Sequence, residues 1–264
     1  MGAQPQPATA VSLRGIAKTF ANGVTALDNF SFDVRDGEFV SLLGPSGCGK
    51  STALRIVAGL TAPSAGDVRV LDDGAAVGKI GFVFQEPTLM PWATVAANVR
   101  LPFRLQGESG TDIDSKVAQA LEQVGLSGFA EAYPRELSGG MKMRASIARA
   151  LVTEPRLLLM DEPFAALDEI TRFKLNNDLL ALWQILRRTV VFVTHSVFES
   201  VYLSQRIVVM TPRPGRVFSE LVIDAPYPRD ERFRTSADYA GYCRLVSEAL
   251  AEAMAAGDAP GAAA

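Results

Sequence analysis

The chain has 264 residues, of which 48% are hydrophobic and 21% are charged, as in an ordinary globular protein of one large or two small domains. Its formal net charge of -3 provides no overall positive field that would attract nucleic acid or anionic lipid, so we expect no nucleic-acid partner. It has no apolar run of membrane-spanning length and does not begin with a secretory leader pattern, which indicates a cytosolic protein that reaches a membrane only through a protein partner. The two cysteines, Cys48 and Cys243, fit no metal or redox spacing, and we expect no disulfide between them.

Short apolar runs rich in β-branched residues recur along the chain and predict strands, several of them buried on both faces. These runs cover residues 11–20, 30–34, 39–43, 68–71, 80–84, 157–160, 190–194, 207–210 and 217–223. The interval from 87 to 150 differs, because it contains no convincing strand. Its helical periodicity falls in residues 95–105, 113–124 and 141–152. The sequence therefore predicts an α/β protein that carries a helical insert.

The two ends of the chain differ from its interior in composition. Residues 1–10 and 257–264 are mostly small or polar, so we expect both ends to be disordered. A proline-rich connection at 224–230 precedes a predicted terminal helix at 236–255. The packing face of this helix should carry Tyr239, Tyr242, Leu245, Val246, Ala249 and Leu250.

A glycine-rich loop lies between the strand expected at 39–43 and a helical stretch at 53–60. It fits the pattern G-x-x-x-x-G-K-[ST] in the strand-to-helix context that this pattern requires. Its glycines let consecutive backbone N–H groups point inward, while Lys50 can reach the β- and γ-phosphate oxygens and Ser51 can ligate Mg²⁺. The sequence therefore predicts a nucleotide-binding phosphate loop. The residues of this loop are Gly44, Pro45, Ser46, Gly47, Cys48, Gly49, Lys50, Ser51 and Thr52.

Two acidic residues, Asp161 and Glu162, follow the apolar strand expected at 157–160. At the carboxyl end of a parallel strand they would meet the ligand crevice of an α/β sheet. We expect Asp161 to hold Mg²⁺, directly or through water, and Glu162 to act as general base on the attacking water. The alternative is a simple exit from a strand into a turn, which the phosphate loop disfavours.

Two further polar residues follow predicted strands. His195 is the only histidine in the chain and comes directly after residues 190–194, where its side chain could sense a γ-phosphate. A lone histidine is otherwise most often a structural or surface residue. Gln85 ends the run at 80–84 and opens the helical insert, so Mg²⁺ bound to its amide oxygen would pull on the insert.

The most specific motif is the segment Leu137-Ser138-Gly139-Gly140, which continues Met141-Lys142-Met143-Arg144 and is called the signature segment below. A serine and two glycines ahead of a helical stretch predict a helix N-terminus whose exposed N–H groups can hold a phosphate. The alternative is a Gly-Gly turn that only opens a helix. Asp168 is predicted to cap a long helix, which is compatible with a role at an interface.

Taken in their order along the chain, these motifs resemble those of the nucleotide-binding subunits of ABC transporters. The resemblance extends from about residue 11 to residue 216. The resemblance implies a P-loop NTPase of ABC type, with a RecA-like core, an N-terminal antiparallel β-subdomain and an α-helical subdomain inserted at about 87–150. The ATPase domain would span residues 11–223, followed by an extension with a helix at 224–256. Phe20 falls where the family stacks an aromatic ring on adenine, and packing in the core is its alternative.

The resemblance also implies how the site residues cooperate. ATP on the phosphate loop of one subunit would be covered by the signature segment of a second copy, so that a head-to-tail dimer completes two half-sites. The family pattern assigns catalysis to Glu162 and His195, and Mg²⁺ binding to Ser51, Gln85 and Asp161. Closure on ATP and reopening after hydrolysis would move the helical insert against membrane permease subunits. The nucleotide contacts are assigned to Phe20, the loop residues 44–52, Gln85, Ser138, Gly139, Gly140 and Asp168.

Two positions depart from the family pattern, and one of them points to a branch. Met141 stands where glutamine is usual, and Ser196 stands where aspartate usually follows the histidine, although its hydroxyl can still cap a helix. Met141 and the stretch from Gln85 to Val95 resemble the importers for nitrate, sulfonates, taurine and bicarbonate. The same branch imports pyrimidine or riboflavin-type compounds, and the ATPase subunit does not touch the cargo, so both classes stay open.

Pro91 and Trp92, within that stretch, have two interpretations. They either pack inside the insert or line a groove that accepts a coupling helix of a membrane subunit.

Other functional classes are disfavoured by what the chain lacks. Soluble ABC ATPases of DNA repair carry long coiled coils between phosphate loop and signature, and those of translation carry two cassettes. Exporters often fuse the cassette to membrane helices, and Glu162 with His195 argues against a non-hydrolysing binding module. We expect a peripheral subunit on the cytoplasmic face of the inner membrane. Its partners would be a second copy, permease subunits and, through these, a secreted or periplasmic solute-binding protein.

Overall fold

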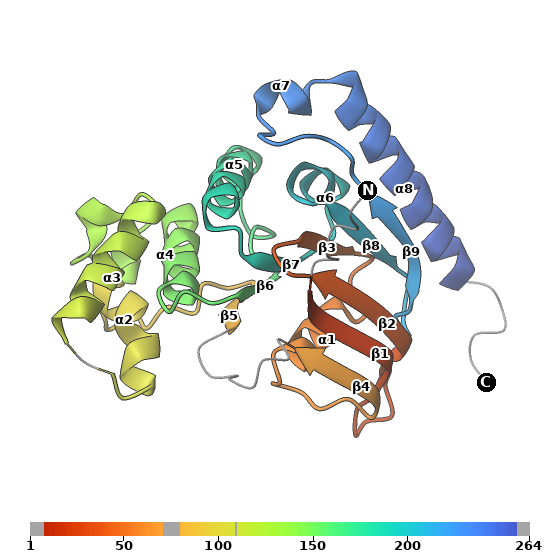
Figure 1. The fold of residues 1–264 in the computed structure, drawn as a ribbon, viewed down its shortest axis with the longest axis horizontal. Coiled ribbons are helices and arrows are strands. Elements are labelled where there is room, and N and C mark those ends of the chain that lie inside the picture. The colour runs from red at the N-terminus through yellow and green to blue at the C-terminus, as the bar shows by residue number, and fades with distance from the viewer. Residues whose placement is uncertain (1–7, 71–79, 109, 258–264) are drawn as a thin grey trace, which may run out of the picture. The chain divides into compact units, whose positions relative to one another are not determined.

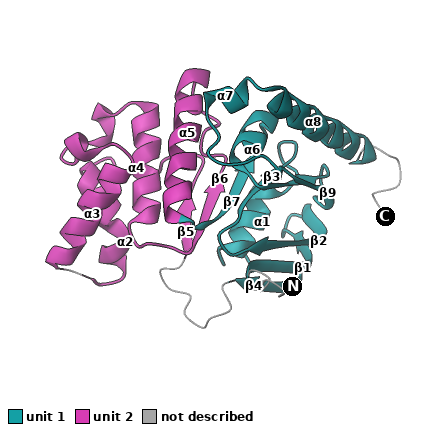
Figure 2. Ribbon diagram, turned by 45° about the horizontal axis from the view of Figure 1, so that its top comes forward, with its two compact units in different colours: residues 1–75, 187–264 teal, residues 76–186 magenta. Residues whose placement is uncertain are grey.

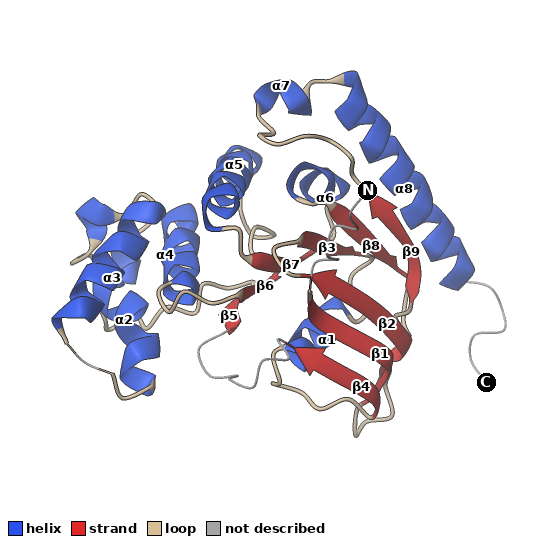
Figure 3. Cartoon of the chain, in the orientation of Figure 1, coloured by secondary structure: helices blue, strands red, loops and turns tan. Residues whose placement is uncertain are grey.

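The computed structural model describes residues 8–70, 80–108 and 110–257, shown in Figure 1. They form two compact units, the first from residues 1–75 and 187–264 and the second from residues 76–186 (Figure 2). Each unit contains both helices and strands (Figure 3), which confirms the predicted α/β class.

The first unit contains an antiparallel sheet in the order β2-β1-β4, which is the N-terminal β-subdomain that the resemblance implied. Its strands are β1 (Thr9–Thr19), β2 (Thr25–Arg35) and β4 (Ala65–Val70). Alternate residues of β2 are buried, among them Phe30, Phe32 and Val34, as expected for a strand with one covered face. The strand predicted at 30–34 is longer than expected, because residues 25–29 also pair with β1.

A second set of strands in the same unit has the order β7-β3-β8-β9. It comprises β7 (Thr189–Thr194), β3 (Phe39–Leu43), β8 (Arg206–Met210) and β9 (Val217–Val222). β3 pairs in parallel with β7 and β8, whereas β9 is antiparallel to β8. Every residue of β3 and β7 is buried, which is typical of parallel strands covered on both faces. Helix α1 (Lys50–Val57) follows β3, and helix α6 (Val197–Leu203) follows β7.

The first unit ends with the short helix α7 (Glu231–Arg234) and the long helix α8 (Ala237–Gly257), which runs along α6 (Figure 1). The terminal helix was predicted, but its packing face was partly wrong, because Leu245 is 46% exposed. The buried stripe instead joins Tyr239, Cys243, Val246 and Ala253, at spacings that keep them on one side of the helix. Both cysteines are free and buried.

The disorder expected at the two ends falls mostly outside the described residues. Among those that are described, Thr9 and Ala10 belong to β1, and Gly257 ends α8. The expectation was wrong for these three, because Thr9 pairs with Arg35 and Ala10 is buried.

The second unit holds two parallel strands, β5 (Ile80–Val83) and β6 (Leu157–Asp161), and the predicted helical insert. The three helices expected in the insert are present, each within two residues of its predicted start. Among the described helices, none combines the length and the apolar character that crossing a bilayer requires. The helices are α2 (Val95–Leu105), α3 (Thr111–Gln123), α4 (Gly139–Leu151) and α5 (Glu169–Leu186), with short 3₁₀ turns η1 (Ser127–Phe129) and η2 (Pro134–Glu136).

Candidate functional site

The phosphate loop, residues 44–52, leaves β3 and enters α1 in a curled conformation that requires glycine. Gly47 and Gly49 have φ angles of 77° and 107°, in the region that other residues rarely adopt. A Cβ atom on Gly49 would also lie 2.6 Å from the carbonyl oxygen of Ala26. Within this curl the buried Lys50 ammonium donates to the carbonyl oxygens of Gly44 at 2.8 Å and Pro45 at 2.9 Å. The loop is therefore formed around a positive charge, as anion binding requires.

A second loop, residues 211–216, supports the phosphate loop. Arg213 Nε donates to the carbonyl oxygen of Gly47 at 3.0 Å. A Cβ atom on Gly215 would lie only 2.0 Å from the carbonyl oxygen of Cys48, so no other residue fits there. The sequence did not predict this support, because no local pattern links the two loops.

His195 leaves the sheet at the same edge as the phosphate loop. In the parallel pair β3–β7, Leu43 lies opposite Thr194, so the residues that follow, Gly44 and His195, emerge side by side. Ser196 caps α6 as predicted, with its Oγ accepting from the Glu199 amide at 3.3 Å. The first unit thus presents His195 next to the curled loop.

Phe20 directly follows β1 and is not a core residue. It is 40% exposed, and Lys18 Nζ lies 5.3 Å from the centroid of its ring. The core-packing alternative is therefore wrong, and stacking of the ring on adenine stays a prediction.

In the second unit, Gln85 and Asp161 lie at one edge of a parallel strand pair. Val83 is opposite Met160 in the β5–β6 register, so Asp161 directly follows this pair and Gln85 comes two residues after Val83. Asp161 is only 7% exposed, whereas Glu162 turns out of the strand with a φ of 46°. This angle is unfavourable for a residue other than glycine, and such strain is typical of functional sites.

The signature segment forms the N-terminus of α4, as predicted. Ser138 is the N-cap residue, and its Oγ accepts from the Met141 amide at 3.3 Å. Gly140 has no room for a side chain, because a Cβ atom would lie 2.7 Å from Cγ2 of Thr171 in α5. The first turn of α4 therefore packs against the start of α5.

Asp168 caps α5 as predicted and lies beside this turn. Its Oδ1 accepts from the Thr171 amide at 3.0 Å, and the hydrogen bonds from Thr171 lower the pKa of Asp168. The neighbouring Leu167 would have its Cδ2 atom 3.4 Å from a Cβ atom on Gly139. The signature segment and the residues before α5 are thus one local cluster.

The other end of α4 holds the chain after Gln85, through a residue that sequence reasoning missed. Arg149 donates to the carbonyl oxygen of Pro87 at 2.9 Å, and to the carbonyl oxygen and Oγ1 of Thr88 at 2.8 Å each. Burial lowers the pKa of the Arg149 guanidinium. Since an α-helix rises 1.5 Å per residue, Ser138 and Arg149 are about 16 Å apart along α4. The signature segment is therefore well separated from the chain that follows Gln85.

The loop between Met90 and Thr94 is held by one buried amide. Asn98 is fully buried, its Oδ1 accepts from the Met90 amide at 2.7 Å, and its Nδ2 lies within 3.2 Å of the carbonyl oxygens of Met90, Ala93 and Thr94. Trp92, in this loop, is 76% exposed. Core packing of Trp92 is therefore wrong, and the groove interpretation remains.

Replacing Asn98 with Ala should destabilise the second unit by about 2–4 kcal/mol, because several buried polar groups lose their partner at once. Urea denaturation of the variant and the wild type measures the difference. The exposed amide of Gln123 offers a matched control, since Gln123→Ala should leave the midpoint nearly unchanged. Equal midpoints for Asn98→Ala and the wild type would contradict the assignment.

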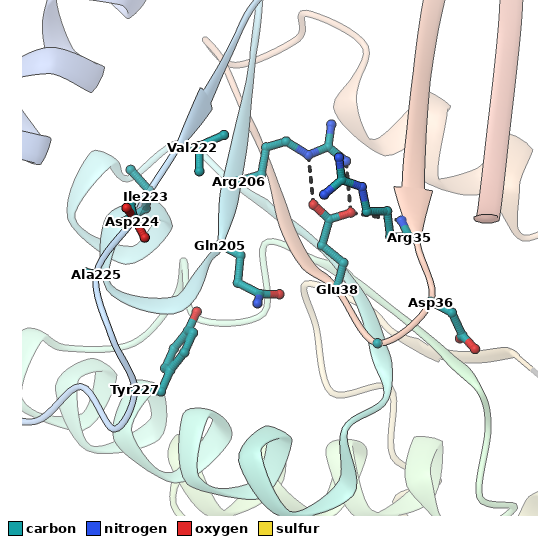
Figure 4. A pocket seen from close by; sticks show the side chains of 11 residues that line it. Arg35, Asp36, Glu38, Gln205, Arg206, Val222, Ile223, Asp224, Ala225 and Tyr227 are labelled. Atoms are coloured by element: carbon teal, nitrogen blue, oxygen red, sulfur yellow. Dashed lines mark hydrogen bonds and ion pairs between the residues drawn. The ribbon is translucent and has the colours of Figure 1, made fainter. Parts of the chain in front are cut away.

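A cavity of about 450 Å³ in the first unit lies near the amino end of β3 (Figure 4), whereas the phosphate loop follows the carboxyl end of that strand. It is lined by residues that lie next to the start of β3, the start of β8 and the end of β9, and several of its polar groups are bonded within the protein. Glu38 pairs with Arg206 at 2.9 Å, and the Tyr227 hydroxyl donates to the Leu203 carbonyl oxygen at 3.0 Å. Burial raises the pKa of Tyr227 to about 12. With these groups engaged, the cavity shows no recognisable site for a nucleotide.

Comparison with known proteins identifies the same family that the motifs resemble. The family profile described as ABC transporter matches residues 27–165. An uncharacterized ABC transporter ATP-binding protein of Methanocaldococcus jannaschii is 48% identical over 233 residues, which cover 87% of this chain and 85% of that protein. An aliphatic sulfonates import ATP-binding protein of Pseudomonas syringae pv. syringae is 46% identical over 93% of this chain and 97% of its own length. That of Bacillus cereus is 43% identical over 84% of this chain and 89% of its own length.

Solved structures agree with the sequence relatives. A dimeric post-hydrolysis state of an ATP-binding cassette bound to ADP and Pi matches with a TM-score of 0.71 and 35% identity, over 82% of this chain and 100% of that one. The matched cassette confirms the P-loop fold of ABC type, in agreement with the curled loop around Lys50. The chain therefore belongs to the ABC transporter family, as one of its ATP-hydrolysing cassettes.

Proposed function

We propose that the chain is the ATP-hydrolysing subunit of an importer for sulfonate-type anions. The observation that carries the proposal is the preformed phosphate loop around Lys50, in a chain whose sulfonate-import relatives match over most of their length. Residues 11–223 would form the ATPase domain, with the helical subdomain inserted at about 87–150 and residues 224–256 as an extension. Uptake of a pyrimidine or riboflavin-type compound is the alternative, which the names of these relatives do not favour.

The phosphate loop binds the β- and γ-phosphates of ATP. The Lys50 ammonium exchanges its carbonyl partners for phosphate oxygens, which carry a full negative charge, and the inward amides of the loop hold the β-phosphate. Phe20 stacks on the adenine, and His195 donates a hydrogen bond to the γ-phosphate. Glu162 accepts the proton of the water that attacks the γ-phosphorus, so it acts as general base.

The residues assigned to Mg²⁺ suit that ion. Within the described parts of the chain, no three His, Cys, Asp or Glu residues gather as a protein cage for a metal would require. Mg²⁺ sites in proteins commonly use one or two carboxylates with water and phosphate oxygens, and Asp161, Ser51 and Gln85 would supply oxygens of the right kind. When bound, Mg²⁺ neutralises charge on the β- and γ-phosphate oxygens.

The solved structures similar to this chain support a shared site between two copies. Within the second unit, Ser138 at the start of α4 lies about 16 Å along the helix from Arg149, which holds the chain that follows Gln85. The solved cassette bound to ADP and Pi is a dimer. In a head-to-tail dimer of this chain, Ser138, Gly139 and Gly140 of one copy cover the ATP of the other, and Asp168 lies at the interface.

The helical insert connects this ATPase to the membrane. Trp92 lines a cavity of about 550 Å³ together with Met90, Ala97, Leu101 and Leu105. Such an apolar hollow beside an exposed tryptophan suits an amphipathic coupling helix of a permease subunit. The chain would then be peripheral on the cytoplasmic face of the cell membrane, and the permease would receive its cargo from a secreted or periplasmic binding protein.

Replacing Trp92 with Ala should abolish copurification of the permease and lower uptake at least tenfold, because a central aromatic anchor is removed from the interface. Ile185 provides the control: it is 78% exposed on α5, and Ile185→Ala should retain both properties. Copurification of an intact complex with the Trp92 variant would refute the docking assignment.

Uptake of labelled ethanesulfonate by cells with and without this chain tests the proposed cargo. Deletion should abolish that uptake and leave labelled uracil and riboflavin uptake intact. If deletion abolishes uracil or riboflavin uptake instead, the sulfonate assignment is wrong.

A further inference from the structure

Arg229, in the proline-rich connection before α7, is a buried cation with an unusual set of partners. Its side chain donates to five backbone carbonyl oxygens at 2.8–3.2 Å and is 4% exposed. Its guanidinium carbon also lies 4.2 Å from the ring centroid of Tyr227 and 5.4 Å from that of Phe233. In residues 8–70, 80–108 and 110–257, no carboxylate forms an ion pair with it. Burial accordingly lowers the pKa of Arg229.

Three of these five carbonyls belong to the end of α6. Arg229 Nη1 donates to Val201 at 2.9 Å, Tyr202 at 3.1 Å and Ser204 at 2.8 Å. The last carbonyls of a helix have no partner within the helix and carry its negative dipole end, so a cation there stabilises it. Arg229 therefore acts as the C-terminal cap of α6.

The rest of the C-terminal segment holds α6 as well. The Tyr239 hydroxyl in α8 donates to the Phe198 carbonyl oxygen at 3.0 Å, in the first turn of α6. The Tyr227 hydroxyl donates to Leu203 at 3.0 Å, and the Tyr202 hydroxyl donates back to the Arg229 carbonyl oxygen at 2.8 Å. A helix of seven residues is unstable by itself, so its position depends on such contacts.

α6 begins at Val197, two residues after His195. Ser196 caps the helix, so the backbone of His195 is joined to its first turn and must follow any shift of α6. We propose that Arg229, assisted by Tyr239, is a positioning residue that fixes the imidazole of His195 through α6. The proposal rests on the γ-phosphate role given to His195 above, and it assigns the C-terminal segment a part in ATP hydrolysis.

ATP turnover of the purified full chain, measured with radiolabelled ATP in the wild-type and His195→Ala backgrounds, tests this proposal. With His195 present, Arg229→Met should lower kcat about tenfold, because the imidazole of His195 would be misplaced. Tyr239→Phe should lower kcat about threefold, because only one hydrogen bond to α6 is lost. KM for ATP should stay within about twofold, because the phosphate loop is untouched. Arg229→Lys, which keeps a charged donor, should recover part of kcat.

In the His195→Ala background, the Arg229 and Tyr239 variants should cause no further loss, because residues that act through one group are not additive. Ser247→Ala is the control on α8, since its hydroxyl donates at 2.7 Å within its own helix to Cys243 and should change kcat in neither background. Equal losses of kcat in both backgrounds would mean that Arg229 only stabilises the fold. This outcome would overturn the positioning role of Arg229 and leave the proposed function standing. Full turnover of His195→Ala itself would refute the role of His195 and the inference with it. If Arg229→Met fails to fold, the Tyr239→Phe and Arg229→Lys arms decide the result.

Discussion

Replacing Glu162 with Gln should lower ATP turnover by about 10²–10⁴-fold while ATP binding is retained, because only the group that accepts the proton of water is removed. The amide has nearly the shape of the carboxylate, so the turn at φ 46° and the end of β6 should be preserved. Bound ATP that is not hydrolysed should also keep two copies associated, and the variant should accumulate as a nucleotide-bound dimer.

Phosphate release and light scattering in the presence of ATP measure the two properties. Glu169, an exposed carboxylate in the first turn of α5, provides the matched control, and Glu169→Gln should hydrolyse ATP at the wild-type rate. Substantial turnover by the Glu162 variant would exclude this residue as the general base.

Replacing Lys50 with Ala should weaken ATP binding by about 10²–10⁴-fold, because charge-assisted hydrogen bonds to two phosphates are lost and each contributes about 1.5–3 kcal/mol. The free protein should also lose stability, since the carbonyl oxygens of Gly44 and Pro45 lose the ammonium that joins them. Turnover should then be undetectable at millimolar ATP.

Titration with a fluorescent ATP analogue measures this affinity, and a thermal melt measures the stability. Arg55 is an exposed cation in the last turn of the same helix, so Arg55→Ala removes an equal charge without touching the loop. Wild-type affinity in the Lys50 variant would place the nucleotide elsewhere on the chain.

The parts of the fold that follow local rules could be predicted from the sequence. The apolar runs gave the strands, and the helix periodicity gave α2 and α4 closely, because both depend on neighbouring residues. The caps at Ser138 and Ser196 were also predictable, since capping requires only a suitable side chain one position before the helix.

What could not be predicted depends on contacts between residues far apart in the chain. Three arginines donate hydrogen bonds from their guanidinium groups to backbone carbonyl oxygens of distant residues. Arg149 bonds to Thr88, Arg213 bonds to Gly47 and Arg229 bonds to the end of α6. A carbonyl is present at every position, so no sequence pattern marks such a partner. The face of α8 was partly wrong for a related reason, because the exposure of Leu245 depends on what packs against the helix.

The contacts at the two ends of α4 make this helix a lever within the second unit. Arg149 fixes one end to the chain after Gln85, and a Cβ atom on Gly81 would lie 2.5 Å from the Ala150 carbonyl oxygen, so that end has no free space. If α4 tilts by about 10° about its Arg149 end, Ser138, which lies about 16 Å away along the helix, moves by about 3 Å. That displacement is about the length of a hydrogen bond, so a small angular change near Gln85 is enough to make or break a contact at Ser138.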